Sequence, residues 1–136
     1  MAVRSVERFL QFAKEGRGFY KSLNQMHVVS AEAGRCSCEL KLSDEHLNSK
    51  NTLHGGLTAT LIDAVSSMAV ATTHKAPGFT TDLNITYMRP AKKGDTISIV
   101  AECLKVGNAM AFVSVNILNK SDEDKLIAQG RHTAKL

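Results

Sequence analysis

Residues 51–71 read NTLHGGLTATLIDAVSSMAVA, and this stretch decides how the rest of the chain must fold. With about 100° between successive residues, a helix over 55–73 carries apolar side chains on nearly all sides. Such a helix is stable only when other elements cover most of its surface. Its one charged residue, Asp63, lies on an arc of small and polar side chains beside Thr60, Ser66 and Ser67.

The segments around this helix have the alternation of strands. Apolar spacing predicts a helix over 3–15, strands over 23–30 and 35–42 with a turn at 31–34, a polar loop over 43–54, a turn at 75–78, and strands over 80–88, 96–106, 109–119 and 125–134. Short connections favour an antiparallel meander for the last four strands. The order predicts an α+β fold, with a sheet curved around one long helix.

Composition limits the function. The 136 residues suit one domain over 1–136, and 43% hydrophobic with 22% charged residues is ordinary for a globular protein. A net charge of +4 favours an anionic ligand but is too weak to indicate nucleic acid. No apolar run is long enough to span a membrane.

The three cysteines argue for a reducing compartment. An odd number, with Cys36 and Cys38 one residue apart, is a poor disulfide framework and has no second ligand pair for zinc. We therefore expect no metal and no cofactor, and a location in the cytoplasm or in association with mitochondria. The basic N-terminal helix is loosely similar to a mitochondrial presequence, although Glu7 and Glu15 argue against that reading.

Asp63 and the Gly55–Gly56 pair each allow two interpretations. An isolated helix aspartate is usually a solvated surface residue, but a solvent-facing arc normally carries further charges, and small side chains suggest packing against a second subunit. The two glycines either form a tight turn or expose backbone N–H groups to a ligand oxygen at the positive end of the helix. Because Asp63 lies about 10 Å along the axis from Gly56, both could reach one small molecule only across two subunits packed antiparallel.

Three blocks, TLHGGLTATLID, DLNITYMRPAK and KLIAQGRHT, occur in an order that resembles the hotdog-fold thioesterases of the phenylacetate-degradation type, with their HGG…D signature. The resemblance covers nearly the whole chain. It implies a hotdog fold with a short additional N-terminal helix, a homodimer that associates to a homotetramer, and hydrolysis of acyl-CoA thioesters, here of medium- to long-chain fatty acyl groups, to fatty acid and coenzyme A.

The resemblance also implies roles for five residues. Asp63 is the general base or the nucleophile, the Gly55 N–H polarises the thioester carbonyl, and Asn48 donates a second hydrogen bond to it. His54 orients the loop and Asn48. Thr80 stands where close relatives carry a serine that holds the water, although it is equally explained as an ordinary residue that opens a strand.

Coenzyme A carries phosphates, so a basic rim is expected beside the site. The resemblance places its contacts at residues near the ends of strands: Tyr87, Met88, Arg89, Pro90, Ala91, Lys92, Lys105, Gly107, Asn108, Met110 and Lys135. Without the resemblance, the basic cluster at 89–93 is a solvated loop. We expect the fatty tail to enter an apolar tunnel between helix and sheet.

Two other functions fit parts of the pattern. A hotdog dehydratase would need a proline-rich loop before the helix, whereas the prolines here are Pro77 and Pro90. An acyl-CoA-binding regulatory module would act through a lipid-transfer or regulatory protein partner. Release of free thiol from palmitoyl-CoA separates hydrolysis from both alternatives.

Overall fold

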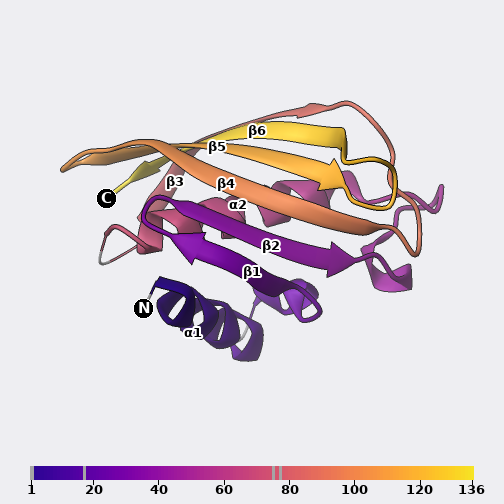
Figure 1. Ribbon diagram of the computed structural model, residues 1–136, viewed down its shortest axis with the longest axis horizontal. Coiled ribbons are helices and arrows are strands. Elements are labelled where there is room, and N and C mark those ends of the chain that lie inside the picture. The colour runs from indigo at the N-terminus through magenta and orange to yellow at the C-terminus, as the bar shows by residue number, and fades with distance from the viewer. Residues whose placement is uncertain (1, 17, 75, 77) are drawn as a thin grey trace.

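A computed structural model describes residues 2–16, 18–74, 76 and 78–136. Six antiparallel strands form one sheet in the order β1-β2-β4-β5-β6-β3, and the long helix α2 lies in its curve (Figure 1). The elements are α1 (Ala2–Glu15), η1 (Phe19–Leu23), β1 (His27–Glu32), β2 (Arg35–Lys41), η2 (Asp44–His46), α2 (Gly55–Ala71), β3 (Phe79–Tyr87), β4 (Thr96–Val106), β5 (Met110–Asn119) and β6 (Lys125–Lys135). This confirms the predicted α+β architecture.

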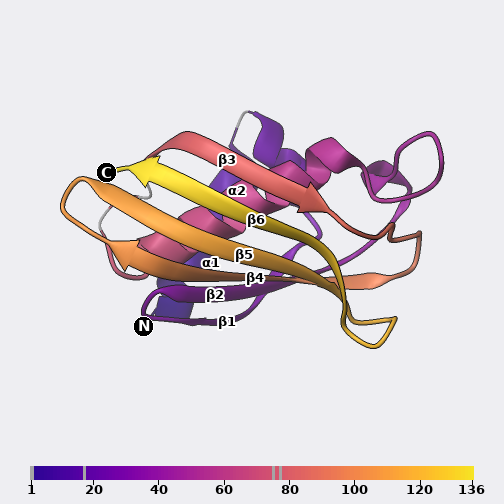
Figure 2. The same cartoon turned by 90° about the horizontal axis from the view of Figure 1, so that it is seen from above.

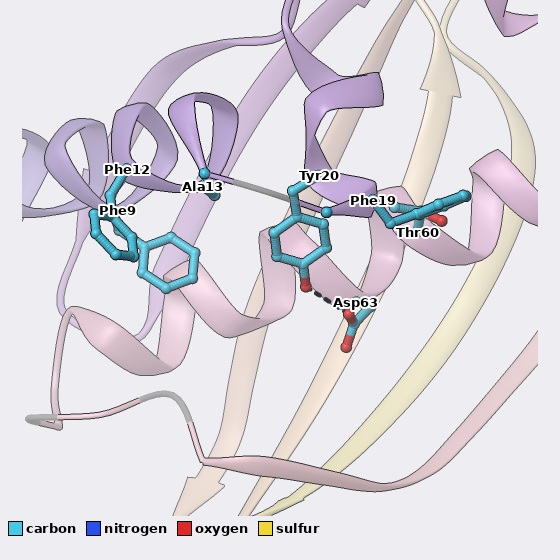
Figure 3. A pocket seen from close by; sticks show the side chains of 9 residues that line it. Phe9, Phe12, Ala13, Phe19, Tyr20, Thr60 and Asp63 are labelled. Atoms are coloured by element: carbon cyan, nitrogen blue, oxygen red, sulfur yellow. Dashed lines mark hydrogen bonds between the residues drawn. The ribbon is translucent and has the colours of Figure 1, made fainter.

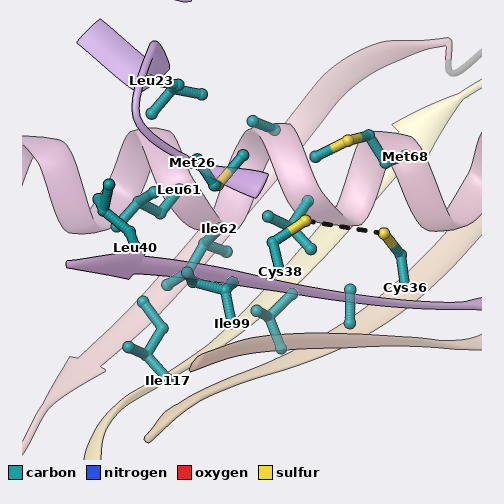
Figure 4. Close-up of a cluster of buried hydrophobic side chains, with 14 of the residues drawn as sticks. Leu23, Met26, Cys36, Cys38, Leu40, Leu61, Ile62, Met68, Ile99 and Ile117 are labelled. Atoms are coloured by element: carbon teal, nitrogen blue, oxygen red, sulfur yellow. Dashed lines mark hydrogen bonds between the residues drawn. The ribbon is translucent and has the colours of Figure 1, made fainter. Parts of the chain in front are cut away.

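The core lies between α2 and the concave face of the sheet. Leu61, Ile62, Val65 and Met68 of α2 are completely buried. They belong to one core cluster with inward residues of the strands, among them Cys38, Ile99 and Ile117 (Figure 4). Full burial of one such side chain contributes about 1.5–3 kcal/mol. The predicted inward row of 35–42 is correct, because its alternate residues Cys36, Cys38, Leu40 and Leu42 are all buried.

The predicted meander is correct for β4, β5 and β6 but wrong for β3. Strand β3 pairs with β6 at the far edge of the sheet, so it is not a neighbour of β4. The segment 88–95 therefore crosses one end of the sheet, where the Leu53 N–H donates to the Ala91 carbonyl at 2.8 Å and Thr52 bridges Lys92. Leu53 and Thr52, in the loop before α2, thus satisfy backbone groups of the connection between β3 and β4, which does not form a tight hairpin.

The N-terminal region differs from the prediction over 23–34. A short 3-10 helix, η1, precedes β1, because Leu23 and Met26 turn inward and are buried instead of extending as a strand. Strand β1 then begins at His27 and continues to Glu32, so the turn comprises only 33–34, with Gly34 at a φ of 78°. Helix α1 packs beside β1 and α2, as both views show (Figures 1 and 2).

The other predicted elements agree with the structure to within two residues. The polar loop over 43–54 is irregular as expected, apart from η2. The turn predicted at 75–78 includes residues 75 and 77, which lie outside the described residues. Of the helices in the described ranges, none combines the length and apolar character needed to cross a membrane.

Candidate active site

Asp63 lies in the middle of α2, on the side that faces η1 (Figure 3). Its Oδ2 accepts a hydrogen bond from the Tyr20 hydroxyl at 2.6 Å, and its Oδ1 accepts one from the Thr80 hydroxyl at 2.9 Å. The side chain is 29% exposed. Each oxygen of this carboxylate thus accepts a hydrogen bond, while the side chain stays accessible to small molecules. Asp63 is therefore not a freely solvated surface residue.

The network continues into the protein through His132. Its Nε2 lies 2.8 Å from the Thr80 hydroxyl oxygen and 3.7 Å from Asp63 Oδ1, and its Nδ1 contacts the Ser66 hydroxyl. An ionised carboxylate can only accept, so the Thr80 proton points at Asp63. Thr80 must then accept the Nε2–H of His132, so Nδ1 carries no proton and faces the Ser66 hydroxyl, which also donates to the Ile62 carbonyl at 2.6 Å. The chain of donors ends at Asp63.

Burial sets the protonation of both groups that flank the carboxylate. His132 is 2% exposed, and burial lowers its pKa while the nearby Asp63 charge partly opposes that effect. The imidazole is therefore neutral at neutral pH, as the donor pattern requires. Burial, and then the hydrogen bond to Asp63, raise the pKa of Tyr20, which keeps its hydroxyl a permanent donor.

Sequence reasoning did not find Tyr20 or His132. His132 lies on the inward row of β6, between the buried Gly130 and Ala134. A histidine among small residues on the face of a strand that is predicted to be buried could have indicated a buried polar partner. Tyr20 gave no such signal, because it lies in a segment predicted to have no regular structure.

The N-terminus of α2 forms a second polar group. The His54 ring accepts the Gly56 N–H at 2.9 Å and so caps the helix. The Tyr87 hydroxyl donates to the Gly55 carbonyl at 2.8 Å, and a Cβ on Gly55 would lie 3.6 Å from the Tyr87 ring. The Tyr87 ring thus lies beside Gly55 at this end of the helix, and the expected role of the Gly55 N–H stays a prediction.

Asn48 is oriented by its own loop. Its Oδ1 accepts from the backbone N–H groups of Lys50 and Thr52, and its Nδ2 donates to the Thr52 hydroxyl at 2.9 Å. Thr52 thus holds the Asn48 side chain, and the orienting role expected for His54 stays a prediction. An Nδ2–H donor has two hydrogens, so one remains for a ligand.

The two polar groups are separate within one protomer. Gly55 and Asp63 are eight positions apart on α2, or about 12 Å along its axis. A single thioester carbonyl cannot contact both in the same chain. We name the two groups of side chains the carboxylate half-site, which comprises Asp63, Thr80, Tyr20 and His132, and the helix-end half-site, which comprises Gly55, Asn48, His54 and Tyr87.

The predicted nucleotide contacts also divide into two groups. Residues 87–92 comprise the last residue of β3 and the segment after it, near the N-terminus of α2. Residues 105–110 form the β4–β5 hairpin beside Lys135, which pairs with Met110. Because Phe79 pairs with Lys135 and Tyr87 lies at the other end of β3, the groups are about 26 Å apart in one chain. Figure 1 shows them at opposite ends of the sheet.

Two members of the first group are less available than predicted. Ala91 is 1% exposed and its carbonyl accepts from Leu53, so its side chain cannot contact a nucleotide. Arg89 donates through Nη1 to the Leu126 carbonyl at 3.0 Å but remains exposed. Tyr87, Met88, Pro90 and Lys92 are exposed.

The described side chains do not form a metal site. No group of three or more His, Cys, Asp or Glu side chains in the described ranges could hold an ion. Cys36, Cys38 and Cys103 are free thiols, and the first two are buried with their sulfurs 3.9 Å apart.

The chain is similar to known proteins along nearly all of its length. A profile described as Thioesterase superfamily matches residues 50–125. Acyl-coenzyme A thioesterase 13 of Homo sapiens is 48% identical over 134 residues, which span 98% of this chain and 95% of that protein.

Solved structures give the same result. Zebrafish thioesterase superfamily member 2 superposes with a TM-score of 0.95 at 43% identity, covering 100% of this chain and 99% of that one. The smu.793 protein of Streptococcus mutans UA159, solved bound to acetyl CoA, superposes with a TM-score of 0.79 at 27% identity and covers 90% of this chain and 94% of that one. These likenesses confirm the predicted hotdog fold, and the chain belongs to the thioesterase superfamily.

Proposed function

We propose that the protein hydrolyses acyl-CoA thioesters, with a preference for medium- to long-chain fatty acyl groups. The observation that carries this proposal is the Asp63 carboxylate, partly exposed and fixed by the Tyr20 and Thr80 hydroxyls on a helix with no other charge. The similarity to human acyl-coenzyme A thioesterase 13, and to a structure bound to acetyl CoA, supports the substrate class.

Asp63 activates a water molecule. In the general-base route, the carboxylate takes a proton while the water oxygen adds to the thioester carbonyl carbon. The C–S bond then breaks, and the coenzyme A thiolate leaves and takes up the proton. General-base catalysis contributes about 10²–10⁴-fold to such a step. The Thr80 and Tyr20 donors occupy one position on each carboxylate oxygen, so the remaining lone pairs point in fixed directions.

The helix-end half-site stabilises the charge that develops on the carbonyl oxygen. The Gly55 N–H and the free Asn48 Nδ2–H are donors at the positive end of α2. Losing one such donor costs about 10²–10³-fold in rate. His54 contributes by capping the helix and so fixing the Gly55–Gly56 backbone.

A complete site requires two protomers. An antiparallel pairing of two α2 helices would bring Asp63 of one protomer close to Gly55 of its partner. The same pairing would bring residues 105–110 and Lys135 of one protomer toward residues 87–92 of the other. We therefore propose a homodimer as the smallest active unit, with a homotetramer as its further assembly. Lys92 and Lys105 are exposed and supply positive charge for the coenzyme A phosphates.

Thiol release from acyl-CoA in the presence of a thiol reagent tests the proposal. We expect wild type to release coenzyme A and Asp63→Asn to lose about 10²–10⁴-fold in kcat. The matched control is Asp82→Asn, an exposed aspartate on β3 outside both half-sites. Binding of acyl-CoA without thiol release would instead indicate a regulatory module. Reversible hydration of an enoyl-CoA would indicate a dehydratase.

The role of Asp63 as base or nucleophile can be separated by single-turnover hydrolysis in ¹⁸O-water. A covalent anhydride places label in the Asp63 carboxylate after hydrolysis at the aspartyl carbon. A general base leaves that carboxylate unlabelled.

A further inference from the structure

A hollow of about 540 Å³ opens beside Asp63, between the N-terminal segment and α2 (Figure 3). Its volume is within the range of small-molecule sites. Helix α1, η1 and α2 each contribute to the wall, which includes Phe9, Phe12, Ala13, Phe19, Tyr20 and Thr60. The catalytic carboxylate thus lies in the wall of a space that the N-terminal helix creates.

The wall of this hollow is suited to an apolar ligand. Four of its side chains are aromatic, and the Tyr20 hydroxyl is already bonded to Asp63. Asp63 is the one charged residue among the described residues that line it. Phe12 and Phe19 are 79% and 71% exposed, an unusual state for two large aromatic side chains around one opening.

The place predicted for the fatty tail, between helix and sheet, is occupied by the core. Leu61, Ile62, Val65 and Met68 fill the sheet-facing side of α2 and are fully buried. A chain of methylenes could enter there only by displacing them. The hollow on the other side of the helix is already open and has Asp63 in its wall.

We propose that this hollow binds the hydrocarbon tail of the acyl thioester, so that α1 and η1 set the preference for chain length. The inference rests on the proposed hydrolysis of acyl-CoA. A carbonyl placed at Asp63 for attack leaves the tail directly beside Tyr20, with Ala13 and Phe12 along the wall on one side of Tyr20 and Phe19 on the other (Figure 3).

The measurable consequence is the dependence of kcat/KM on acyl length. Transfer of one methylene from water to an apolar site contributes about 0.8 kcal/mol, or a factor of about four. We therefore expect kcat/KM of wild type to rise by up to about fourfold per methylene from butyryl-CoA until the hollow is full, with substrates kept below micelle formation.

Two variants change the hollow in opposite ways. Phe12→Ala removes an exposed part of its wall, and Ala13→Leu fills part of its volume while keeping a good helix former. Each should lower the ratio of the dodecanoyl-CoA to the butyryl-CoA kcat/KM by at least about fivefold. The matched control is Leu104→Ala on β4, which removes a 64% exposed apolar side chain that does not line the hollow and should leave that ratio unchanged.

The outcomes separate the two proposals. If wild type releases no thiol from any acyl-CoA, the proposed function is wrong. If wild type hydrolyses both substrates and neither variant changes the ratio more than Leu104→Ala does, hydrolysis stands and the assignment of the hollow is overturned. A changed sedimentation coefficient for Phe12→Ala with an unchanged ratio would show that a second copy of the chain covers the hollow, and would equally overturn it.

Discussion

The hydroxyl of Thr80 connects the Asp63 carboxylate to the buried imidazole of His132, and its removal is the sharpest test of the proposed site. Thr80→Val keeps the β-branched shape but deletes the oxygen that bonds Asp63 Oδ1 at 2.9 Å and His132 Nε2 at 2.8 Å. Each such hydrogen bond is worth about 0.5–1.5 kcal/mol net, and an unsatisfied buried donor costs about 1–3 kcal/mol.

Local rearrangement limits that loss. His132 Nε2 lies 3.7 Å from Asp63 Oδ1, so a movement of about 1 Å would let the two bond directly. We therefore expect Thr80→Val to lower the free energy of unfolding by about 1–2 kcal/mol. Because the carboxylate would then turn toward His132, kcat should also fall, by about 10–100-fold.

The neighbouring residue provides the matched control. The Thr81 hydroxyl donates a hydrogen bond of 3.2 Å to the Thr133 carbonyl on the neighbouring strand β6. Thr81→Val should change the free energy of unfolding by no more than about 0.5 kcal/mol and leave kcat near the wild-type value. Urea denaturation at equal m-value measures the stability of both variants, and thiol release measures their activity.

Equal loss of stability in Thr80→Val and Thr81→Val would refute the reasoning, since it would show that the Thr80 hydroxyl has no special partners. Full activity of Thr80→Val would refute the role of Thr80 in orienting Asp63. Thr80→Ser, which restores the hydroxyl, should recover most of the activity.

Three further predictions concern the same region. Tyr20→Phe removes the 2.6 Å donor to Asp63 and should lower the free energy of unfolding by about 1–2 kcal/mol in urea denaturation, together with a fall in kcat. Because the pKa of His132 is lowered by burial, the unfolded chain binds more protons below about pH 6.5, so stability should fall with pH from there downward, and His132→Gln should reduce that slope. Gly130→Ala places a Cβ 2.9 Å from Ile62 and should destabilise by about 1–3 kcal/mol in thermal unfolding.

Matched changes elsewhere in the chain serve as controls for these predictions. Tyr87→Phe also removes a tyrosine hydroxyl that bonds α2, at the Gly55 carbonyl. It tests whether the loss of unfolding free energy in Tyr20→Phe is specific to the bond with Asp63. Gly107→Ala meets only ordinary contact, at 3.5 Å, and should be tolerated. The buried His46, whose pKa is also lowered by burial, will keep part of the acid sensitivity in His132→Gln. An unchanged pH slope in His132→Gln would contradict the assignment of that slope to His132.

The sequence by itself determined the class of fold and the central acid. A helix apolar on nearly every side must be enclosed, and strands of period two can enclose it. The lone carboxylate on the remaining arc of small side chains made Asp63 a candidate site residue, with a solvated surface position as the alternative. The three sequence blocks added the family, which the comparisons confirm.

Only the tertiary structure decided what surrounds that acid. Tyr20, Thr80 and His132 lie 43, 17 and 69 positions from Asp63 along the chain, and the pairing of β3 with β6 brings Thr80 beside His132. Local periodicity reports which face of an element is buried, but it does not report which distant element covers that face. The position of β3, the buried imidazole and the hollow beside α1 all depend on such long-range pairing. The sequence pattern therefore placed β3 beside β4, which is wrong, and did not reveal the imidazole or the hollow.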